Sequence, residues 1–212
     1  MTTTRELLRR RHWIFDLDGT LTVAVHDFEA IREQLGLPPG RPILEQLAER
    51  PADERAVLAA ELAAIEQDIA RGARPAEGAA ELLDRLSAQG HPLGILTRNT
   101  HANAMITLAA SGLERWFAPE HVLGRDEAAP KPSPEGVRVH LRRWRADPAD
   151  AVMVGDFAFD LQAGRAAGVA TLYLDPSGVF PHAEWADVCL ESFAQLRSGP
   201  NDPAPPGWPH DR

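Results

Sequence analysis

Short runs of apolar residues alternate along most of the chain with longer segments in which apolar positions recur every three or four residues. A short apolar run that ends at Gly, Asp or Thr is typical of a buried strand, and the longer period is typical of an amphipathic helix. Strands that alternate with helices favour a parallel sheet covered on both faces, so the pattern predicts an α/β fold. The predicted strands cover residues 13–17, 92–96, 121–124, 151–154, 169–174 and 188–190.

The segments between these strands carry the signals that start and stop helices. Ser133 and Pro134 are typical of an N-cap followed by a first helical residue. Glycine just past the last periodic position is the commonest C-terminal stop. The predicted helices cover residues 77–89, 101–110, 133–144 and 158–167, and Gly90, Gly112 and Gly168 end three of them.

The alternation breaks between the first and second predicted strands. Three apolar stripes with helical spacing occur there, and each needs another helix to pack against. Helices inserted directly after the first strand of an α/β domain predict an all-helical cap subdomain over residues 22–75, with a core of residues 1–21 and 76–197. Residues 198–212 are rich in proline and are expected to be a disordered tail. The stripes are Phe28, Ile31 and Leu35; Ile43, Leu44 and Leu47; and Leu58, Leu62, Ile65 and Ile69.

Composition narrows the class of protein. Apolar residues make up 44% of the 212 and charged residues 25%, values typical of a globular domain, and no window reaches the ~18 apolar residues of a membrane-spanning helix. The net charge of −9 argues against a nucleic-acid partner. A single cysteine allows no internal disulfide, which favours a cytoplasmic location. Lys131 is the only lysine and Pro132 follows it, which excludes a phosphate-binding G-x-x-x-x-G-K-[ST] loop.

Four acidic residues follow two of the predicted strands. Asp16 and Asp18 come after the first strand, and Asp156 and Asp160 come after the fourth. Alone, the first pair fits an Asx turn equally well, and Asp156 fits a helix N-cap. Because the carboxyl ends of parallel strands meet at one edge of a sheet, the four acids are expected to converge. Such a cluster needs a hard cation, and oxygen ligands suit Mg²⁺.

A second set of residues suits an anion. Thr97 ends the second strand, where its hydroxyl and the amides of Arg98 and Asn99 would form an anion-binding helix start. A β-branched residue that serves only the sheet is the alternative for Thr97. Lys131 lies in a loop stiffened by two prolines and offers a point charge for a phosphoryl oxygen, although a lone lysine is more often simply solvated.

Taken together, these motifs resemble those of the haloacid dehalogenase superfamily of hydrolases. The resemblance rests on the run from Phe15 to Leu21, on Thr97 after an apolar strand, on Lys131 before Pro132, and on Gly155-Asp156 with Asp160. The helical insert is similar to the cap of the phosphoglycolate-phosphatase-like branch. The resemblance implies a Rossmann-like parallel core with helices on both faces and a helical cap.

The resemblance also implies a role for each motif residue. Asp16 would be the nucleophile that forms an aspartyl-phosphate, and Asp18 the general acid and base. Mg²⁺ would be held by the carboxylates of Asp16 and Asp156 and the backbone carbonyl of Asp18. Thr97 and Lys131 would bind the phosphoryl oxygens. The remaining member, Asp160, would orient Lys131 or a metal-bound water.

The expected function is therefore a Mg²⁺-dependent phosphatase for a small phosphorylated metabolite, with a 2-phosphoglycolate-like ester as one candidate. Asp18 argues against a dehalogenase, since a halide leaving group needs no proton. A sugar phosphomutase and a non-catalytic phosphate-binding module remain alternatives. Arg41, His26 and Arg74 are the candidates for substrate contacts from the cap or its hinges. Whether the protein is a monomer or a dimer stays open.

Overall fold

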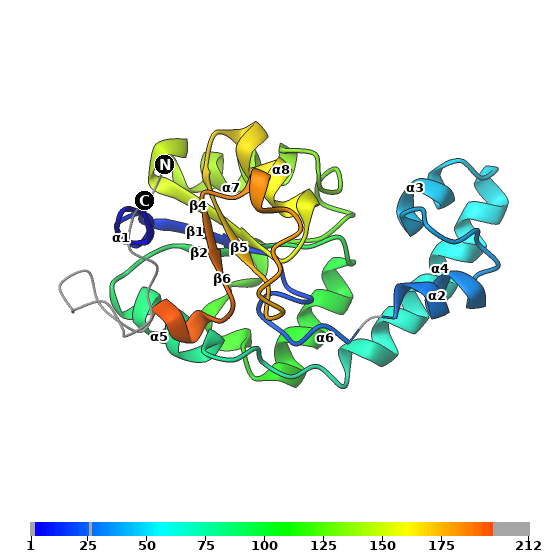
Figure 1. Ribbon diagram of the computed structural model, residues 1–212. Coiled ribbons are helices and arrows are strands. Elements are labelled where there is room, and N and C mark those ends of the chain that lie inside the picture. The colour runs from blue at the N-terminus through cyan, green and yellow to red at the C-terminus, as the bar shows by residue number, and fades with distance from the viewer. Residues whose placement is uncertain (1–2, 26, 197–212) are drawn as a thin grey trace.

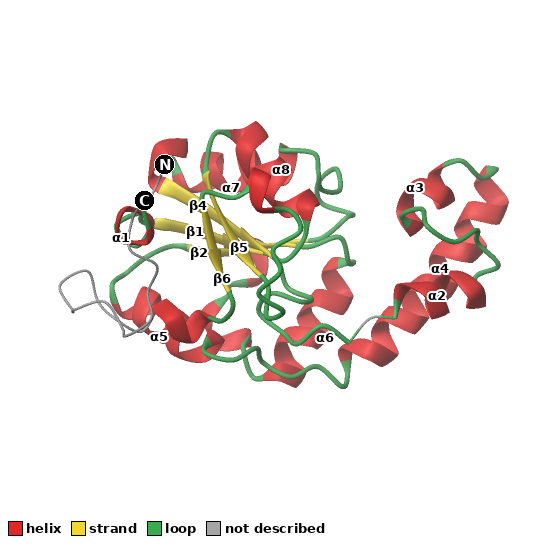
Figure 2. Cartoon of the chain, in the orientation of Figure 1, coloured by secondary structure: helices red, strands yellow, loops and turns green. Residues whose placement is uncertain are grey.

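The computed structural model describes residues 3–25 and 27–196. Six parallel strands form one sheet in the order β3-β2-β1-β4-β5-β6 (Figures 1 and 2). All six predicted strands are present, and their observed bounds differ by up to two residues at either end. These strands are β1 (His12–Phe15), β2 (Leu93–Leu96), β3 (Val122–Leu123), β4 (Ala151–Gly155), β5 (Ala170–Leu174) and β6 (Val188–Leu190).

Helices cover both faces of the sheet, which confirms the α/β fold. Figure 1 shows α5 (Ala79–Ala88) and α6 (His101–Ser111) on one face, and α7 (Glu135–Trp144) and α8 (Ala158–Ala167) on the other. Within β1, Trp13 and Phe15 join the hydrophobic cluster beneath α5 and α6, whereas Ile14 joins the cluster beneath α7 and α8. This alternation is the two-residue period of a strand buried on both faces.

Shorter elements complete the core. Helix α7 begins at Glu135 with Pro134 as its N-cap, one position later than the Ser133 signal predicted, and the Ser133 hydroxyl accepts a hydrogen bond from the Glu135 amide at 3.3 Å. Helix α1 (Thr4–Leu7) buries Leu7 against the α5 face. The 3₁₀ turns are η1 (Glu114–Trp116), η2 (Pro119–His121), η3 (Pro148–Asp150), η4 (Ala183–Trp185) and η5 (Phe193–Leu196).

Three helices lie between β1 and α5, beside the sheet (Figure 1). They are α2 (Phe28–Gln34), α3 (Ile43–Ala48) and α4 (Ala52–Ala70). All three apolar stripes contribute to one hydrophobic cluster that is separate from the two sheet clusters. Phe28 is the exception, since it is 55% exposed. The buried members are Ile31, Leu35, Leu37, Ile43, Leu47 and Leu62.

Backbone hydrogen bonds at the base and packing along α4 tie the inserted helices to the core. Where the chain leaves and re-enters the core, Thr22 bridges both Asp18 and Pro75, and the Val23 amide donates to the Arg74 carbonyl at 3.0 Å. Farther along, α4 packs on α6, where the Asn103 side chain donates to the carbonyl of Ala63 at 3.1 Å. The insert is therefore held both at its base and along one helix.

The predictions for His26 and for the proline-rich tail, residues 198–212, concern residues that the structure does not describe. Among the residues that the structure describes, no helix is both long and apolar enough to cross a membrane.

Replacing Leu83 of α5 tests the sheet cluster. Its side chain is fully buried, so Leu83→Ala removes packed carbon atoms and leaves a cavity. We expect the free energy of unfolding, measured by urea titration, to fall by about 2–5 kcal/mol. The control Val57→Ala changes a side chain that is 59% exposed and should alter that free energy by less than about 0.5 kcal/mol. Equal effects of the two substitutions would contradict this account of the core.

Candidate active site

The sheet order brings three motif residues to one point. From β1 the chain moves to β2 and β3 on one side and then returns to β4 on the other. Asp16, Thr97 and Asp156 each stand at or just past the carboxyl end of one of the three central strands. A crevice opens where the strand order reverses in this way, and α/β proteins bind ligands there.

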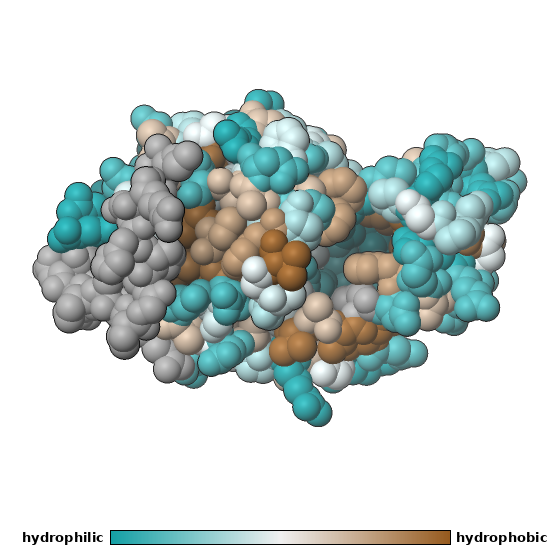
Figure 3. Space-filling view, in the orientation of Figure 1, coloured by the Kyte–Doolittle hydropathy of each residue, from teal (hydrophilic) through white to brown (hydrophobic). Residues whose placement is uncertain are grey.

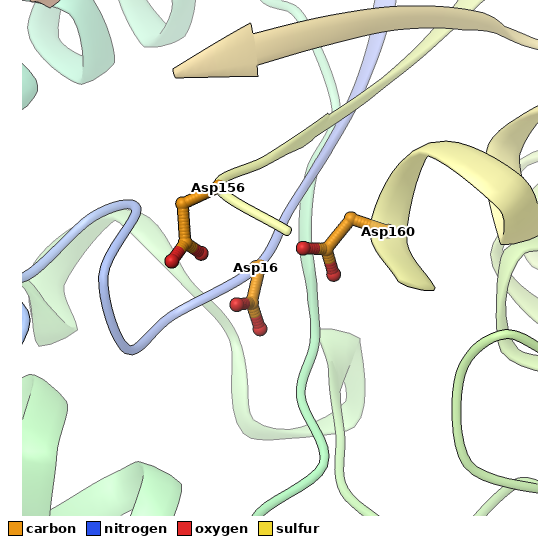
Figure 4. Close-up of side chains that lie close together, drawn as sticks. All are labelled: Asp16, Asp156 and Asp160. Carbon is orange, nitrogen blue, oxygen red and sulfur yellow. The ribbon is translucent and has the colours of Figure 1, made fainter. Parts of the chain in front are cut away.

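Three carboxylates converge in this crevice. One oxygen of each of Asp16, Asp156 and Asp160 lies within 4.8 Å of the others, and Figure 4 shows the three side chains directed into a shared space. Like charges at this spacing repel one another unless a cation or protons offset them. The oxygen-only donor set fits a hard divalent cation such as Mg²⁺. The expected convergence of strand-end acids is therefore observed for Asp16, Asp156 and Asp160, and the set of metal ligands stays a prediction.

Two glycines allow the acids to approach this closely. Gly19 has a φ of +88°, and a Cβ at this position would lie 2.3 Å from Oδ2 of Asp156. At Gly155 a Cβ would lie 2.1 Å from Cβ of Asp160. Any larger residue at either position would displace an acid. Thr20 then fixes the orientation of Asp156 by donating a hydrogen bond to its Oδ1 at 2.9 Å.

Lys131 is the cationic member of the site. Its side chain is 2% exposed, and Nζ lies 2.5 Å from Oδ1 of Asp16 and 2.5 Å from Oδ1 of Asp160. Burial alone would lower the pKa of Lys131, but the two carboxylates outweigh that effect and raise the pKa above its usual value. The ammonium therefore stays charged in the crevice.

The neighbouring acids titrate at higher pH than ordinary aspartates. Burial, followed by the charge of Asp16, raises the pKa of Asp18 to about 7, although a hydrogen bond with the Asn99 side chain opposes the rise. Burial also raises the pKa of Asp160 to about 6 against the influence of Lys131. Burial and the charges of Asp16 and Asp160 raise the pKa of Asp156 well above its usual range. A carboxyl with a pKa near 7 both gives and takes protons at neutral pH.

The turn after β2 differs in detail from the expected anion-binding helix start. Thr97 is buried, and its Oγ1 accepts a hydrogen bond from the Asn99 amide at 3.0 Å. Helix α6 begins only at His101 with Thr100 as its N-cap, so the amides of Arg98 and Asn99 precede the helix. Expecting these two amides to belong to a helix N-terminus was therefore wrong.

The Arg98 side chain turns toward the inserted helices. Its Nη2 donates to both carboxylate oxygens of Glu45 at 2.8 Å, its Nη1 donates to the Lys131 carbonyl, and its guanidinium lies 4.7 Å from the centre of the Phe159 ring. Sequence reasoning missed Glu45, because nothing local marks a partner 53 residues away. The pair joins α3 to the core across the crevice.

The sequence analysis also missed a second ion pair, and this one is buried. Nη1 of Arg125 lies 2.7 Å from Oε1 of Glu66 on α4, and the two side chains are 11% and 12% exposed. The Asn103 side chain donates to the other oxygen of Glu66 at 3.5 Å. One signal was present in the sequence: a glutamate directly follows Ile65 within the apolar seam of α4.

One cleft of about 510 Å³ lies between the core and the inserted helices. Its lining includes the four acids, Asp16, Asp18, Asp156 and Asp160, together with Thr97, Arg98, Asn99 and Lys131. Figure 3 shows the surface hollowed between these two parts. Of the three candidate substrate contacts, Arg41 lines the cleft but pairs with Glu49 at 2.5 Å. Arg74 is exposed at the hinge and is not among the cleft residues, so a direct substrate contact from Arg74 has no support. His26 lies outside the described residues.

Comparison with known proteins places this site in a family. Residues 26–174 match the family model of haloacid dehalogenase-like hydrolases. A protein of Dickeya dadantii (strain 3937), named probable phosphatase IndB, is 34% identical over 182 residues, an alignment that covers 75% of this chain and 78% of that protein. A phosphoglycolate phosphatase of Cupriavidus necator is 35% identical over 119 residues, and the chain spans about half of its length.

Solved structures agree on the fold. A hydrolase from Pseudomonas syringae superposes with a TM-score of 0.74 at 22% identity, covering 87% of this chain and 95% of that one. A Deinococcus radiodurans hydrolase of the same family, solved with bound phosphate and sodium, superposes with a TM-score of 0.65 at 24% identity over 90% and 94% of the two chains. The family match and the relatives agree: the chain belongs to the haloacid dehalogenase-like hydrolases.

Proposed function

We propose that the protein is a Mg²⁺-dependent phosphatase that hydrolyses a small phosphomonoester through an aspartyl-phosphate on Asp16. The observation that carries the proposal is the convergence of Asp16, Asp156 and Asp160 around the buried ammonium of Lys131 in one cleft. Relatives named phosphatase, phosphoglycolate phosphatase and pyrophosphatase support the reaction class.

In this mechanism each residue has a defined task. The free carboxylate oxygen of Asp16 attacks phosphorus, while Lys131 holds the other oxygen and faces the phosphoryl group. Asp18 protonates the leaving oxygen and then takes a proton from the water that releases phosphate, tasks that suit its pKa of about 7. Thr97 contributes its hydroxyl to the phosphoryl oxygens.

The metal ligands follow from the acid cluster. We assign the carboxylates of Asp16 and Asp156 and the backbone carbonyl of Asp18 to Mg²⁺, and we assign Asp160 to the orientation of Lys131, because its oxygen lies 2.5 Å from Nζ. When bound, Mg²⁺ supplies the positive charge that lets an anionic nucleophile meet an anionic ester. Residues 22–75 would act as a cap that covers a small substrate and excludes water. A cytoplasmic location remains a prediction from the single cysteine.

Replacement of the nucleophile tests the mechanism. Asp16→Asn removes the attacking carboxylate, so we expect Mg²⁺-dependent release of inorganic phosphate from p-nitrophenyl phosphate to fall by at least ~10³-fold. The control Asp53→Asn changes an exposed acid on α4 and should leave the rate unchanged. Full activity of Asp16→Asn would reject the proposal. Transfer of phosphate between substrate positions without net release would instead indicate a phosphomutase.

The crowded acids also predict a pH-dependent response to Mg²⁺. The folded-state pKa values of Asp18, Asp156 and Asp160 are raised, whereas these carboxyls titrate near ~3.9 in the unfolded chain. Between pH 4 and 7 the unfolded chain therefore releases protons that the folded protein retains, so in chelator the stability falls as the pH rises through this window. When bound, Mg²⁺ would offset the negative charge that these carboxylates carry once they are deprotonated at high pH.

We expect Mg²⁺ to raise the melting temperature by about 5 °C more at pH 8 than at pH 5, since about 2 kcal/mol corresponds to this shift in a chain of this size. Differential scanning calorimetry with and without chelator measures the effect. Asp156→Asn removes one of the crowded charges and should shrink the difference. An equal response at both pH values would count against the metal assignment.

A further inference from the structure

The cleft extends well beyond the acid cluster. Its volume of about 510 Å³ falls within the range of ~300–1,000 Å³ typical of pockets for drug-sized ligands. A phosphoryl group held by Asp16 and Lys131 occupies only the inner end. The outer end, bounded by α2, α3, the start of α8 and the loop before it, therefore leaves room for a leaving group larger than a two-carbon acid.

The charged side chains at this outer end are already paired within the protein. Among the described residues that line the cleft, every arginine has a carboxylate partner, and the Glu66 carboxylate pairs with Arg125. A second anionic group on the substrate would therefore have to compete with these carboxylates for the guanidinium groups. The arginine pairs are Arg98 with Glu45 at 2.8 Å, Arg41 with Glu49 at 2.5 Å, and Arg32 with Glu29 at 2.5 Å.

The rest of the outer end is apolar. Ile43, Leu44 and Leu62 contribute aliphatic side chains from the inserted helices. From the core, Phe157 and Phe159 form an edge-to-face pair with ring centres 5.1 Å apart, and Phe157 is 48% exposed. An exposed phenyl ring inside a ligand cleft gains from a ligand that covers it, and aromatic partners suit its geometry.

We propose that the leaving group of the substrate carries an uncharged ring that packs on Phe157, and that a second anionic group is disfavoured. The inference rests on the proposed phosphatase function and names its substrate class: phosphomonoesters of neutral, ring-bearing alcohols. This substrate class differs from the substrate in the name of the phosphoglycolate phosphatase relative, which carries a carboxylate beside its phosphate.

Four phosphate esters test separately how a ring and how a carboxylate on the leaving group affect kcat/KM. Benzyl phosphate and ethyl phosphate differ in the ring. A carboxylate is added to the ring in 4-carboxybenzyl phosphate, and it replaces the methyl group of ethyl phosphate in 2-phosphoglycolate. With Mg²⁺ present, we expect kcat/KM for benzyl phosphate to exceed that for ethyl phosphate by about tenfold and that for 4-carboxybenzyl phosphate by about fivefold. Similarly, 2-phosphoglycolate should not exceed ethyl phosphate.

Two variants test which residues cause these two preferences. Phe157→Ala should lower the ratio of kcat/KM between benzyl and ethyl phosphate by about fivefold, whereas Val179→Ala, an exposed apolar residue outside the cleft lining, should leave that ratio unchanged. Glu45→Gln releases the Arg98 guanidinium from its carboxylate partner. This variant should therefore raise kcat/KM for 2-phosphoglycolate relative to ethyl phosphate several-fold.

The outcomes decide the two proposals separately. A preference of the unaltered protein for 2-phosphoglycolate, or a benzyl-to-ethyl ratio that Phe157→Ala leaves unchanged, would overturn the substrate class while the phosphatase proposal stands. Absence of phosphate release from all four esters would overturn the phosphatase proposal. In that case calorimetric binding of benzyl and ethyl phosphate to the unaltered protein with Mg²⁺ still tests the ring contact, and equal affinities would overturn it.

Discussion

The buried ammonium of Lys131 is the interaction on which the site depends. An ammonium that is 2% exposed is stable only if carboxylates replace the water it has lost, and Asp16 and Asp160 do so at 2.5 Å each. One positive charge cannot balance these two acids together with Asp156 and Asp18 nearby. The excess negative charge suits a divalent cation. Under the proposed function, that cation would admit the phosphate dianion, which the acids alone would repel.

The sheet makes this density of charge feasible. Three parallel strands end within one crevice, and the missing side chains of Gly19 and Gly155 let Asp156 and Asp160 approach to distances that a Cβ would forbid. On the side of the inserted helices, positive and negative charges are balanced. The arginines of the insert that line the cleft, Arg32 and Arg41, pair with Glu29 and Glu49, so this wall of the cleft is close to neutral.

The sequence predicted the strands, the core helices and the meeting of the strand-end residues in one cleft, because these follow local rules. Strand period and strand-end acids are visible in a short window, which is why Asp16, Thr97 and Asp156 were found. The outer cleft was not predictable in this way. The pairs Arg98–Glu45 and Arg125–Glu66 join residues 53 and 59 positions apart, and no periodicity marks either partner. Arg74 shows the limit of such reasoning, because nearness to a hinge in sequence does not determine whether a side chain lines the cleft, and Arg74 is exposed and is not among the lining residues.

Chemistry and substrate choice therefore have different physical origins in this molecule. At the inner end negative charges are in excess, and the proposed phosphatase chemistry rests on them. At the outer end the cations are consumed by the protein's own carboxylates, so recognition there falls to shape and apolar contact. A single change such as a lost Glu45 would convert a neutral wall into an anion-binding one without touching the catalytic acids. Relatives with the same inner motifs can thus differ in substrate, and a family name alone does not determine which ester this cleft accepts.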